Sequence, residues 1–278
     1  MIEMVENKNA GSGEARLKVI GVGGAGGNAV NFMIESEDCA GVEFIVANTD
    51  AQALANSFAD DKIQLGNKIT RGLGAGSDPE IGRRAAEEDI ENLKEHIKGT
   101  EILFLAAGLG GGTGSGAMPV IARSAREMGI LTVAVVTKPF EFEGKRRARH
   151  AEDAVRSLEE AADTMIVVPN EKLLEVSDPN ISVIDAFALS NSILKHAVKG
   201  ISDIIQKPGL INVDFADVRS VMHEMGRAIM GTGKCAGEDR AKKAAMQAIQ
   251  SPLLENINID GASGILLNIT GNTSIALH

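Results

Sequence analysis

Three glycine-rich segments of the sequence have the composition of phosphate-binding loops. Gly21–Asn28 follows an apolar run and has the G-x-G-x-x-G spacing, the segment 108–116 is denser in glycine, and 72–76 alternates glycine with Leu and Ala. Such glycines let backbone amides at a helix N-terminus approach a phosphate closely. Tight turns are the alternative explanation, but three such segments together favour a polyphosphate site.

The segment 212–219 is a second candidate for chemistry. Asp214 and Asp217 are three residues apart, so they share one face if a helix begins at Asp214. The pair could simply cap the first helical turn, because aspartate accepts hydrogen bonds from free amides and favours the helix dipole. The residues alone leave open whether these acids also do chemistry.

The glycine segments do not match a P-loop enzyme. Neither Gly-Lys pair, at 144–145 or at 233–234, is followed by the Ser or Thr that G-x-x-x-x-G-K-[ST] requires. A dinucleotide-dependent oxidoreductase is the competing interpretation, in which Asp50 at the end of the second expected strand would hold the ribose. That class does not predict the second, richer glycine segment.

The elements that would position these segments alternate between β-rich runs and helical periodicity, which is typical of β-α units around a parallel sheet. The expected strands are Leu17–Val22, Val42–Ala47, Ile63–Leu65, Ile102–Ala107, Leu131–Thr137 and Thr164–Val168. The expected helices are Ala25–Ile34, Pro79–Ile97 (with Asp78 as its N-cap), Ser115–Met128 and Lys145–Ala161. The sequence thus predicts an α/β fold with a Rossmann-like, doubly wound parallel sheet, and the glycine segments should converge at its carboxyl edge.

A longer helix is predicted over Val183–Gln206, ending at the breaker 207–209. Its expected apolar face comprises Ile184, Phe187, Leu194, Ala197, Ile201 and Ile204. This spacing makes one continuous stripe, so the helix is expected to cross the width of the sheet domain.

A second, smaller α+β unit is expected after this helix. It would contain helices at Asp217–His223 and Asp239–Gln250 and extended segments at Arg227–Gly231 and Ile265–Ile269. Because so few strands cannot complete a sheet, we expect this unit to be C-terminally truncated. The expected divisions are a flexible tail over 1–15, a nucleotide-binding domain over 16–182, the central helix over 183–206 and the partial second domain over 207–278.

Composition excludes several classes of function. Lys and Arg total 28 against 38 Asp and Glu, and the chain has neither Trp nor Tyr, so nucleic acid is not an expected partner. Cys39 and Cys235 stand far apart, which predicts neither a disulfide nor a metal site. The polar first fifteen residues are no signal peptide, and no apolar run reaches the length of a membrane helix. The expected location is therefore cytoplasmic, without membrane insertion.

The segment Gly110–Gly116 resembles the signature of the tubulin and FtsZ family. The resemblance covers most of the chain, from about Arg16 to Gly271, and is closer to FtsZ, the bacterial cell-division GTPase, than to the tubulins. It extends through Asn48–Asp50, Gly72–Pro79, Thr137–Phe140, Pro169-Asn170, Asp185–Phe187 and Pro208–Arg219. Ser115 stands where threonine is commoner in FtsZ, but either hydroxyl can donate to a phosphate.

The resemblance implies that the ligand is GTP or GDP, with Mg²⁺ held mainly by the phosphates and no metal site made of protein residues. The implied phosphate contacts are Gly24, Ala25, Gly26, Gly27, Gly112, Thr113 and Gly114, with Ala75 and Gly76 near the γ-phosphate. The other implied contacts are Glu143 and Arg147 around the ribose, Asn28, Phe187 and Asn191 at guanine, and Asn170 in the same site. Many relatives have aspartate at position 191, and an asparagine on a helix can also be merely solvated.

The resemblance also implies a catalytic role for Asn212, Asp214 and Asp217, whose acids would orient and polarise the hydrolytic water. The long helix would hold them roughly 30 Å or more from the phosphate loops of the same chain, so hydrolysis is expected between two chains of a head-to-tail filament. The implied setting is the mid-cell division ring, with a membrane adaptor and division proteins reached through a tail absent from this chain. A nucleotide-binding scaffold without hydrolysis is a third interpretation, which the two acids oppose.

Overall fold

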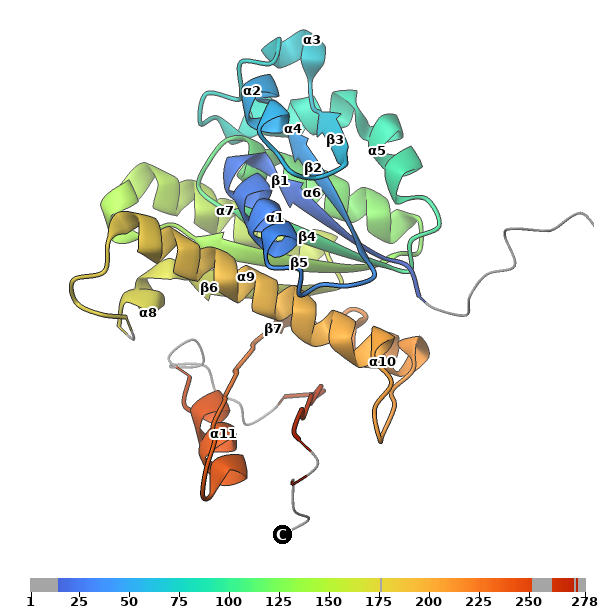
Figure 1. Ribbon diagram of the computed structural model, residues 1–278. Helices are drawn as coiled ribbons and strands as arrows, with labels where there is room; N and C mark the ends of the chain where they lie inside the picture. Colours follow the sequence, from blue (N-terminus) through green and yellow to red (C-terminus); the bar gives the residue numbers. More distant parts are fainter. Residues whose placement is uncertain (1–14, 176, 252–261, 273, 275–278) are drawn as a thin grey trace, which may run out of the picture.

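The computed structural model of the protein describes residues 15–175, 177–251, 262–272 and 274. Its centre is a seven-stranded sheet, parallel throughout, in the order β3-β2-β1-β4-β5-β6-β7 (Figure 1). The strands are β1 (Leu17–Val22), β2 (Val42–Asn48), β3 (Asp61–Gln64), β4 (Ile102–Gly108), β5 (Leu131–Lys138), β6 (Thr164–Pro169) and β7 (Gly226–Ala228). The parallel sheet and its first six strands are confirmed with small shifts at their ends. The tail predicted over 1–15 lies, apart from residue 15, outside the described residues.

Helices cover both faces of this sheet, as a doubly wound fold requires. The longer ones are α1 (Gly23–Glu35), α4 (Pro79–Glu88), α5 (Ile90–Ile97), α6 (Thr113–Glu127), α7 (Lys145–Ala161), α9 (Val183–Gln206), α10 (Phe215–Met222) and α11 (Arg240–Ile249). The short ones are α2 (Ala51–Ala55), α3 (Asn67–Thr70), α8 (Asn170–Leu174) and the 3-10 turn η1 (Glu141–Glu143). Within the described part of the chain, none of these helices combines the length and the apolarity needed to span a bilayer.

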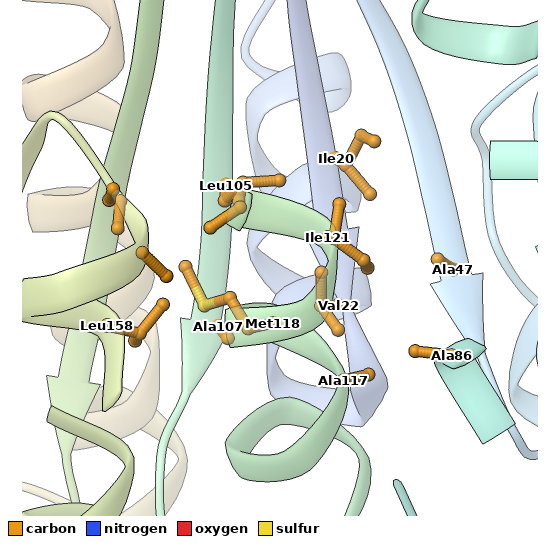
Figure 2. Packing of buried hydrophobic residues seen from close by; sticks show 14 of the residues in the cluster. Ile20, Val22, Ala47, Ala86, Leu105, Ala107, Ala117, Met118, Ile121 and Leu158 are labelled. Carbon is orange, nitrogen blue, oxygen red and sulfur yellow. The ribbon is translucent and has the colours of Figure 1, made fainter. Parts of the chain in front are cut away.

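Two hydrophobic layers flank the sheet. Met118 and Ile121 of α6 pack on strands β1 and β4 in the layer that also includes α4, α5 and α7 (Figure 2). Val30 of α1 and Leu194 of α9 belong to the opposite layer. Successive residues of β4 point to opposite faces and are all buried over Ile102–Ala107, which explains the continuous apolar run of this strand.

Helix α9 has the predicted bounds, but part of its predicted buried face is wrong. Ile184 is 81% exposed, whereas Ala186 and Ser190 are buried and face the molecule in that half of the helix. From Leu194 onward the apolar stripe packs in the layer with α1 as predicted. In the first two turns of α9, small residues therefore face the molecule, and the larger apolar side chains point to the surface.

Two other predicted elements are corrected by the structure. The helix predicted over Pro79–Ile97 breaks at Asp89, whose backbone leaves the helical region and whose carboxylate accepts a hydrogen bond from the amide of Gly66 at 2.6 Å. The proline start with Asp78 as N-cap is confirmed, since Asp78 accepts from the amide of Glu80. Ile265–Ile269 is not a strand, because it shares no ladder with any other segment that the structure describes; Leu266 packs half-buried on the layer with α1 and α9, and Ile265, Leu267 and Ile269 are exposed.

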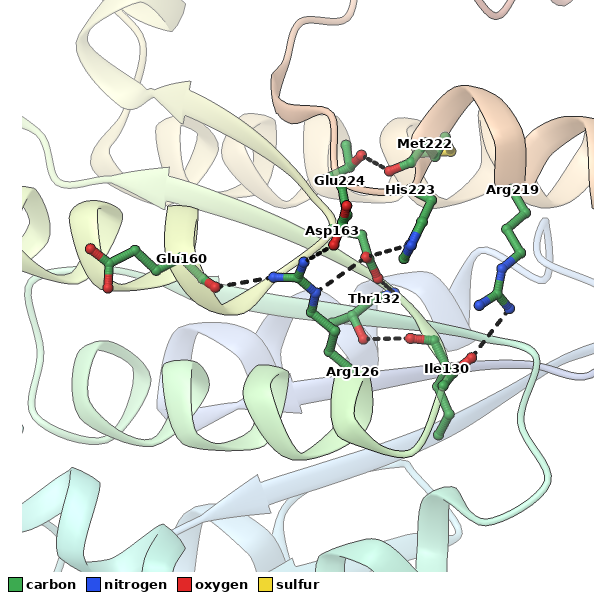
Figure 3. Close-up of polar contacts among 11 residues, drawn as sticks. Arg126, Ile130, Thr132, Glu160, Asp163, Arg219, Met222, His223 and Glu224 are labelled. Carbon is green, nitrogen blue, oxygen red and sulfur yellow. Dashed lines mark hydrogen bonds and ion pairs between the residues drawn. The ribbon is translucent and has the colours of Figure 1, made fainter.

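The segment predicted as extended at Arg227–Gly231 forms β7 instead at Gly226–Ala228, and it adds to the large sheet beside β6. It follows α10, which buries Val218 and Met222 in the layer with α1 and α9. The hydroxyl of Thr164 donates to the carbonyl of Met222 at this junction (Figure 3). Helix α10, which follows the loop 207–214, is thus fixed at the amino end of β6, whereas the glycine segments lie at the carboxyl edge of the sheet.

Candidate nucleotide-binding site

A cleft of about 430 Å³ opens at the carboxyl edge of the sheet, where β1 and β4 are neighbours and their following loops separate. This is the position at which open α/β sheets bind ligands. The cleft is lined by Val22–Ala25, the loop 108–114, Asn48–Asp50 and the first half of α9, together with residues from 74–77, 137–147 and Asn170. Its volume falls within the range of ligand pockets.

The three glycine segments meet at this cleft, as predicted. A Cβ placed on Gly23 would lie 3.0 Å from the amide nitrogen of Gly114, so the first and second segments are in contact. A Cβ on Gly112 would lie 2.8 Å from both the Cβ of Ala75 and the amide nitrogen of Asp78, so the third segment packs against the second. Only glycine permits the backbones to approach this closely.

Two helix N-termini supply hydrogen-bond donors to the cleft. Helix α1 begins after Val22 and α6 begins after Gly112, and neither end has a side-chain cap or an acidic residue in its first turn. The first amides of a helix have no partner within the helix, and the helix dipole makes this end positive. Two such ends beside one cleft make it an anion site that suits phosphates.

Aromatic and amide side chains form the other end of the cleft. Phe187 is 38% exposed and packs edge-to-face on Phe140 and Phe142, with ring centroids 5.3 and 6.3 Å away. Asn191 lies one turn further along α9 and also lines the cleft. Asn170 is buried and accepts a hydrogen bond from the hydroxyl of Ser190 at 2.9 Å. An exposed ring beside two amides can contact the face and the polar edge of a base.

Glu143 and Arg147 line the cleft between these two ends. They form an ion pair across one turn, with Glu143 more deeply buried than Arg147. Glu143 also accepts a hydrogen bond from the amide of Phe140 at 3.0 Å. Both side chains are therefore held in place at the wall of the cleft.

The remaining predicted contacts do not line the cleft. Gly26 and Gly27 lie on the buried face of α1, and a Cβ on Gly26 would lie 2.4 Å from the carbonyl oxygen of Ala106, so this glycine allows the helix to pack closely on the sheet. Asn28 is exposed on α1. In the third glycine segment, Ala75 is buried against Gly112, and Gly76 is exposed with nothing within 4 Å of an added Cβ.

The structure adds residues that the sequence did not predict as contacts, although all of them except Ser190 lie in segments that carry the family resemblance. Thr49, Ser77, Thr137, Pro139 and Ser190 also line the cleft. Thr49 directly follows β2, and Thr137 lies at the carboxyl end of β5. Both strands are neighbours of a strand that leads into a glycine segment, and this position could have identified the two residues from the sequence.

The acid loop, the segment 212–217 with Asp214 and Asp217, lies at the far end of α9 from the cleft. With 24 residues, α9 is about 36 Å long, since a helix rises about 1.5 Å per residue. Asp214 caps α10 by accepting from the amide of Asp217 at 2.8 Å, which confirms the capping interpretation for that residue. Asn212 accepts from the amide of Gly209 at 2.6 Å. The exposed carboxylate of Asp217 has no hydrogen-bond or ion-pair partner among the residues that the structure describes.

A second hollow of about 550 Å³ lies near the other edge of the sheet. Its lining combines apolar side chains, among them Met33, Phe44 and Phe58, with carboxylates such as those of Asp60 and Asp61. These carboxylates would repel a phosphate, and no helix that the structure describes begins among the lining residues. The cleft at the carboxyl edge is therefore the candidate site.

Comparison with known proteins agrees with this site. Residues 16–178 match the GTPase domain of the Tubulin/FtsZ family, and residues 226–278 match the C-terminal domain of the FtsZ family. The cell division protein FtsZ of Buchnera aphidicola subsp. Baizongia pistaciae is 55% identical over 277 residues, which cover 100% of this chain and 71% of that protein. The FtsZ of Pseudomonas putida is 54% identical, with 100% and 69% covered.

A solved FtsZ dimer from M. jannaschii, described as empty, matches this fold with a TM-score of 0.83 and 46% identity, covering 87% of this chain and 70% of that one. The fold and the cleft are those of a tubulin-like GTPase. More narrowly, the chain belongs to the FtsZ family of filament-forming cell-division GTPases. This membership removes the oxidoreductase interpretation.

Proposed function

We propose that the cleft binds GTP and GDP with the phosphates at the N-termini of α1 and α6 and the base beside Phe187. The backbone amides of Gly24, Ala25 and 112–114 would hold the phosphates, and the segment 75–76 would adjoin the γ-phosphate. The observation that carries this assignment is the pair of uncapped helix ends at one cleft. The opposite end has the Phe187 ring and the amides of Asn170 and Asn191 to receive guanine.

Calorimetry tests this assignment. We expect saturable binding of GTP and GDP and none of NAD(H), because the cleft has the amide donors for a polyphosphate together with one aromatic face. Saturable binding of NAD(H) without GTP would end the proposal. A substitution of Gly112 by Leu should abolish binding, since even a Cβ there meets Ala75 and Asp78. Gly200→Ala on α9, outside the cleft lining and with no atom within 4 Å of the added Cβ, is the matched control.

Mg²⁺ would accompany the nucleotide, coordinated mainly by phosphate oxygens and water. The described residues contain no group of three His, Cys, Asp or Glu side chains placed to hold a metal ion by themselves. Asp50 lines the cleft, and one of its oxygens, Oδ1, caps α2 by accepting from two amides. Its other oxygen remains able to accept from a metal-bound water. Such an ion neutralises charge that develops on the phosphates.

We propose that hydrolysis takes place between two chains, with Asp217 and Asp214 of one chain and the phosphates in the cleft of the next. The length of α9 separates the acids from the cleft of their own chain. Beside the acids, Leu210 and Ile211 are 104% and 90% exposed, and adjacent bare apolar side chains are typical of a contact surface. A solved relative is a dimer, which supports self-association. A head-to-tail contact of this kind propagates into a filament.

Mixing two inactive variants tests this arrangement. Asp217→Asn should retain GTP affinity and lose most turnover, and Gly112→Leu should lose GTP binding. If the active site is shared, the intact cleft of the first variant can receive the intact acids of the second, and mixtures regain part of the activity. Asp60→Asn, which removes one exposed carboxylate elsewhere, should keep full activity. No rescue, with co-assembly shown by sedimentation, contradicts a shared site.

A phosphate-release assay over a range of protein concentrations separates the GTPase from a non-hydrolysing scaffold. A shared site predicts that specific activity rises with concentration, because the catalytic contact forms only on association. A measurable but constant specific activity would place all catalytic groups in one chain. Absence of turnover at every concentration would favour the scaffold.

In the cell, these filaments would form the division ring at mid-cell, in the cytoplasm, with membrane adaptor and division proteins as further partners. The family membership supports this setting. A fluorescent fusion of the whole protein should form a band at the division plane, and Asp217→Asn should change the turnover of that band. An evenly distributed signal contradicts the assignment.

A further inference from the structure

The buried side chain of Thr49 contacts the phosphate end of the cleft through Thr113. Thr49 follows β2 directly, has 0% exposure, and its Oγ1 lies 2.7 Å from Oγ1 of Thr113, the first residue of α6. Thr113 is also buried at 9% exposure and lines the cleft. The contact joins two residues that are 64 positions apart in the chain.

The backbone of Thr49 fixes where its hydroxyl lies. Its carbonyl oxygen accepts from the amide of Gly74 at 3.1 Å and from the hydroxyl of Thr70 at 3.2 Å. Two residues further on, the amide of Ala51 donates to the carbonyl of Gly72 at 3.0 Å, which is a second backbone bond to the third glycine segment. Thr49 is thus held by the third glycine segment on its backbone side and by the second on its side-chain side.

The number of protons decides the direction of the hydrogen bond between the two threonines. Each hydroxyl has one proton and can also accept. If Thr113 donated, the proton of Thr49 would be buried without an acceptor, because Thr113 is the hydrogen-bond partner that the described residues give to that hydroxyl. If Thr49 donates, its proton has an acceptor in Oγ1 of Thr113, and neither hydroxyl proton is buried without a partner. The proton of Thr113 then remains available to an acceptor in the cleft.

We propose that Thr49 is a positioning residue for phosphate binding. It donates to Oγ1 of Thr113, and Thr113 then presents its own proton to a phosphate oxygen of the bound nucleotide. Thr49 fixes the hydroxyl of Thr113 in position and orientation before the nucleotide arrives, which lowers the entropy that binding has to remove. This role rests on the proposed binding of a guanine nucleotide in the cleft.

The test is a double-mutant cycle in GDP affinity, measured by calorimetry on the full chain. Thr49→Val keeps the shape of the side chain and removes its proton, so GDP binding should weaken about three- to tenfold, as for the loss of one net hydrogen bond. Thr49→Ser keeps the hydroxyl and should bind within about twofold of the unmodified protein. In a Thr113→Val background, Thr49→Val should cause no further loss.

Two results would overturn the proposal. One is unchanged GDP affinity in Thr49→Val, and the other is an equal loss in both backgrounds, which would indicate a general structural role. Urea unfolding of each variant checks stability separately, and if Thr49→Val does not fold, Thr49→Ala must show the same dependence on Thr113. GDP binding by the unmodified protein separates failure of the proposed function from failure of the proposed role of Thr49. Its failure to bind GDP would refute the proposed function, whereas normal binding with an unaffected Thr49→Val refutes only the role of Thr49.

Discussion

Nδ1 of His223 lies 2.8 Å from Oδ1 of Asp163, and this contact ties the segment after α10 to the amino end of β6 (Figure 3). Asp163 is 1% exposed, and its Oδ2 accepts from the amide of Thr132 at 2.9 Å. Nε of Arg126 lies 3.5 Å from the same carboxylate. A buried negative charge is thus placed where α6, β5, β6 and the α10–β7 segment meet.

Asp163→Asn should therefore destabilise the protein by about 1.5–3 kcal/mol, the scale of hydrogen bonds to a charged group. The amide keeps only one acceptor oxygen and no charge, so either the amide of Thr132 or the side chains of His223 and Arg126 would face a buried NH2 group. Urea unfolding measures the change in free energy. Glu91→Gln, which breaks an exposed pair with Lys94 on α5, is the matched control and should cost at most about 0.5 kcal/mol. Equal effects of the two substitutions would contradict the buried role of Asp163.

Two glycines in helices should respond in opposite directions to alanine. A Cβ on Gly116 of α6 would lie 1.9 Å from the carbonyl oxygen of Pro79, so Gly116→Ala must push α4 away and should destabilise by roughly 1–3 kcal/mol or more. A Cβ on Gly200 of α9 meets nothing within 4 Å, so Gly200→Ala should stabilise by about 0.5–1 kcal/mol. Thermal unfolding of both variants gives the signs, and equal signs would refute the packing argument.

The two cysteines should differ in reactivity. Cys39 is buried at 7% exposure, and burial raises the pKa of its thiol, so little thiolate is present or reachable. Cys235 is partly exposed. We expect iodoacetamide to modify Cys235 first and Cys39 only slowly, as followed by mass spectrometry. In denaturing urea both should react at similar rates, and similar rates in the folded protein would contradict the burial of Cys39.

The stability of the protein should decrease in mildly acidic solution, in part through His196. Partial desolvation by the packed surroundings of α9 lowers the pKa of His196 in the folded state, although the residue as a whole is exposed, and Lys195 adds to the effect. The unfolded chain then binds the proton more readily, so this contribution to stability is present above the ordinary histidine pKa and is lost as pH falls through the lowered value. Urea midpoints at about pH 7.5 and about pH 5.5 measure the decrease. His196→Gln should make it smaller, and an unchanged decrease would contradict this assignment.

The sequence by itself determined the elements and the site that they form. The alternation of apolar runs and helical periodicity identified six strands and the bounds of α9, because these signals lie within a short window of residues. The glycine segments predicted a phosphate site, because parallel strands bring their carboxyl ends to one edge. The family resemblance supplied the guanine nucleotide and the proposed role of Asn212, Asp214 and Asp217.

Only the tertiary structure decided how these elements meet. Three features depend on which neighbours are present, and no local pattern encodes them. They are the inward face of α9 near Ser190, the addition of β7 beside β6, and the lack of a described strand partner for Ile265–Ile269. The contact of Thr49 with Thr113 joins residues 64 positions apart. It exists because the order of the sheet places the ends of β2 and β4 on either side of β1, so their loops meet over that strand.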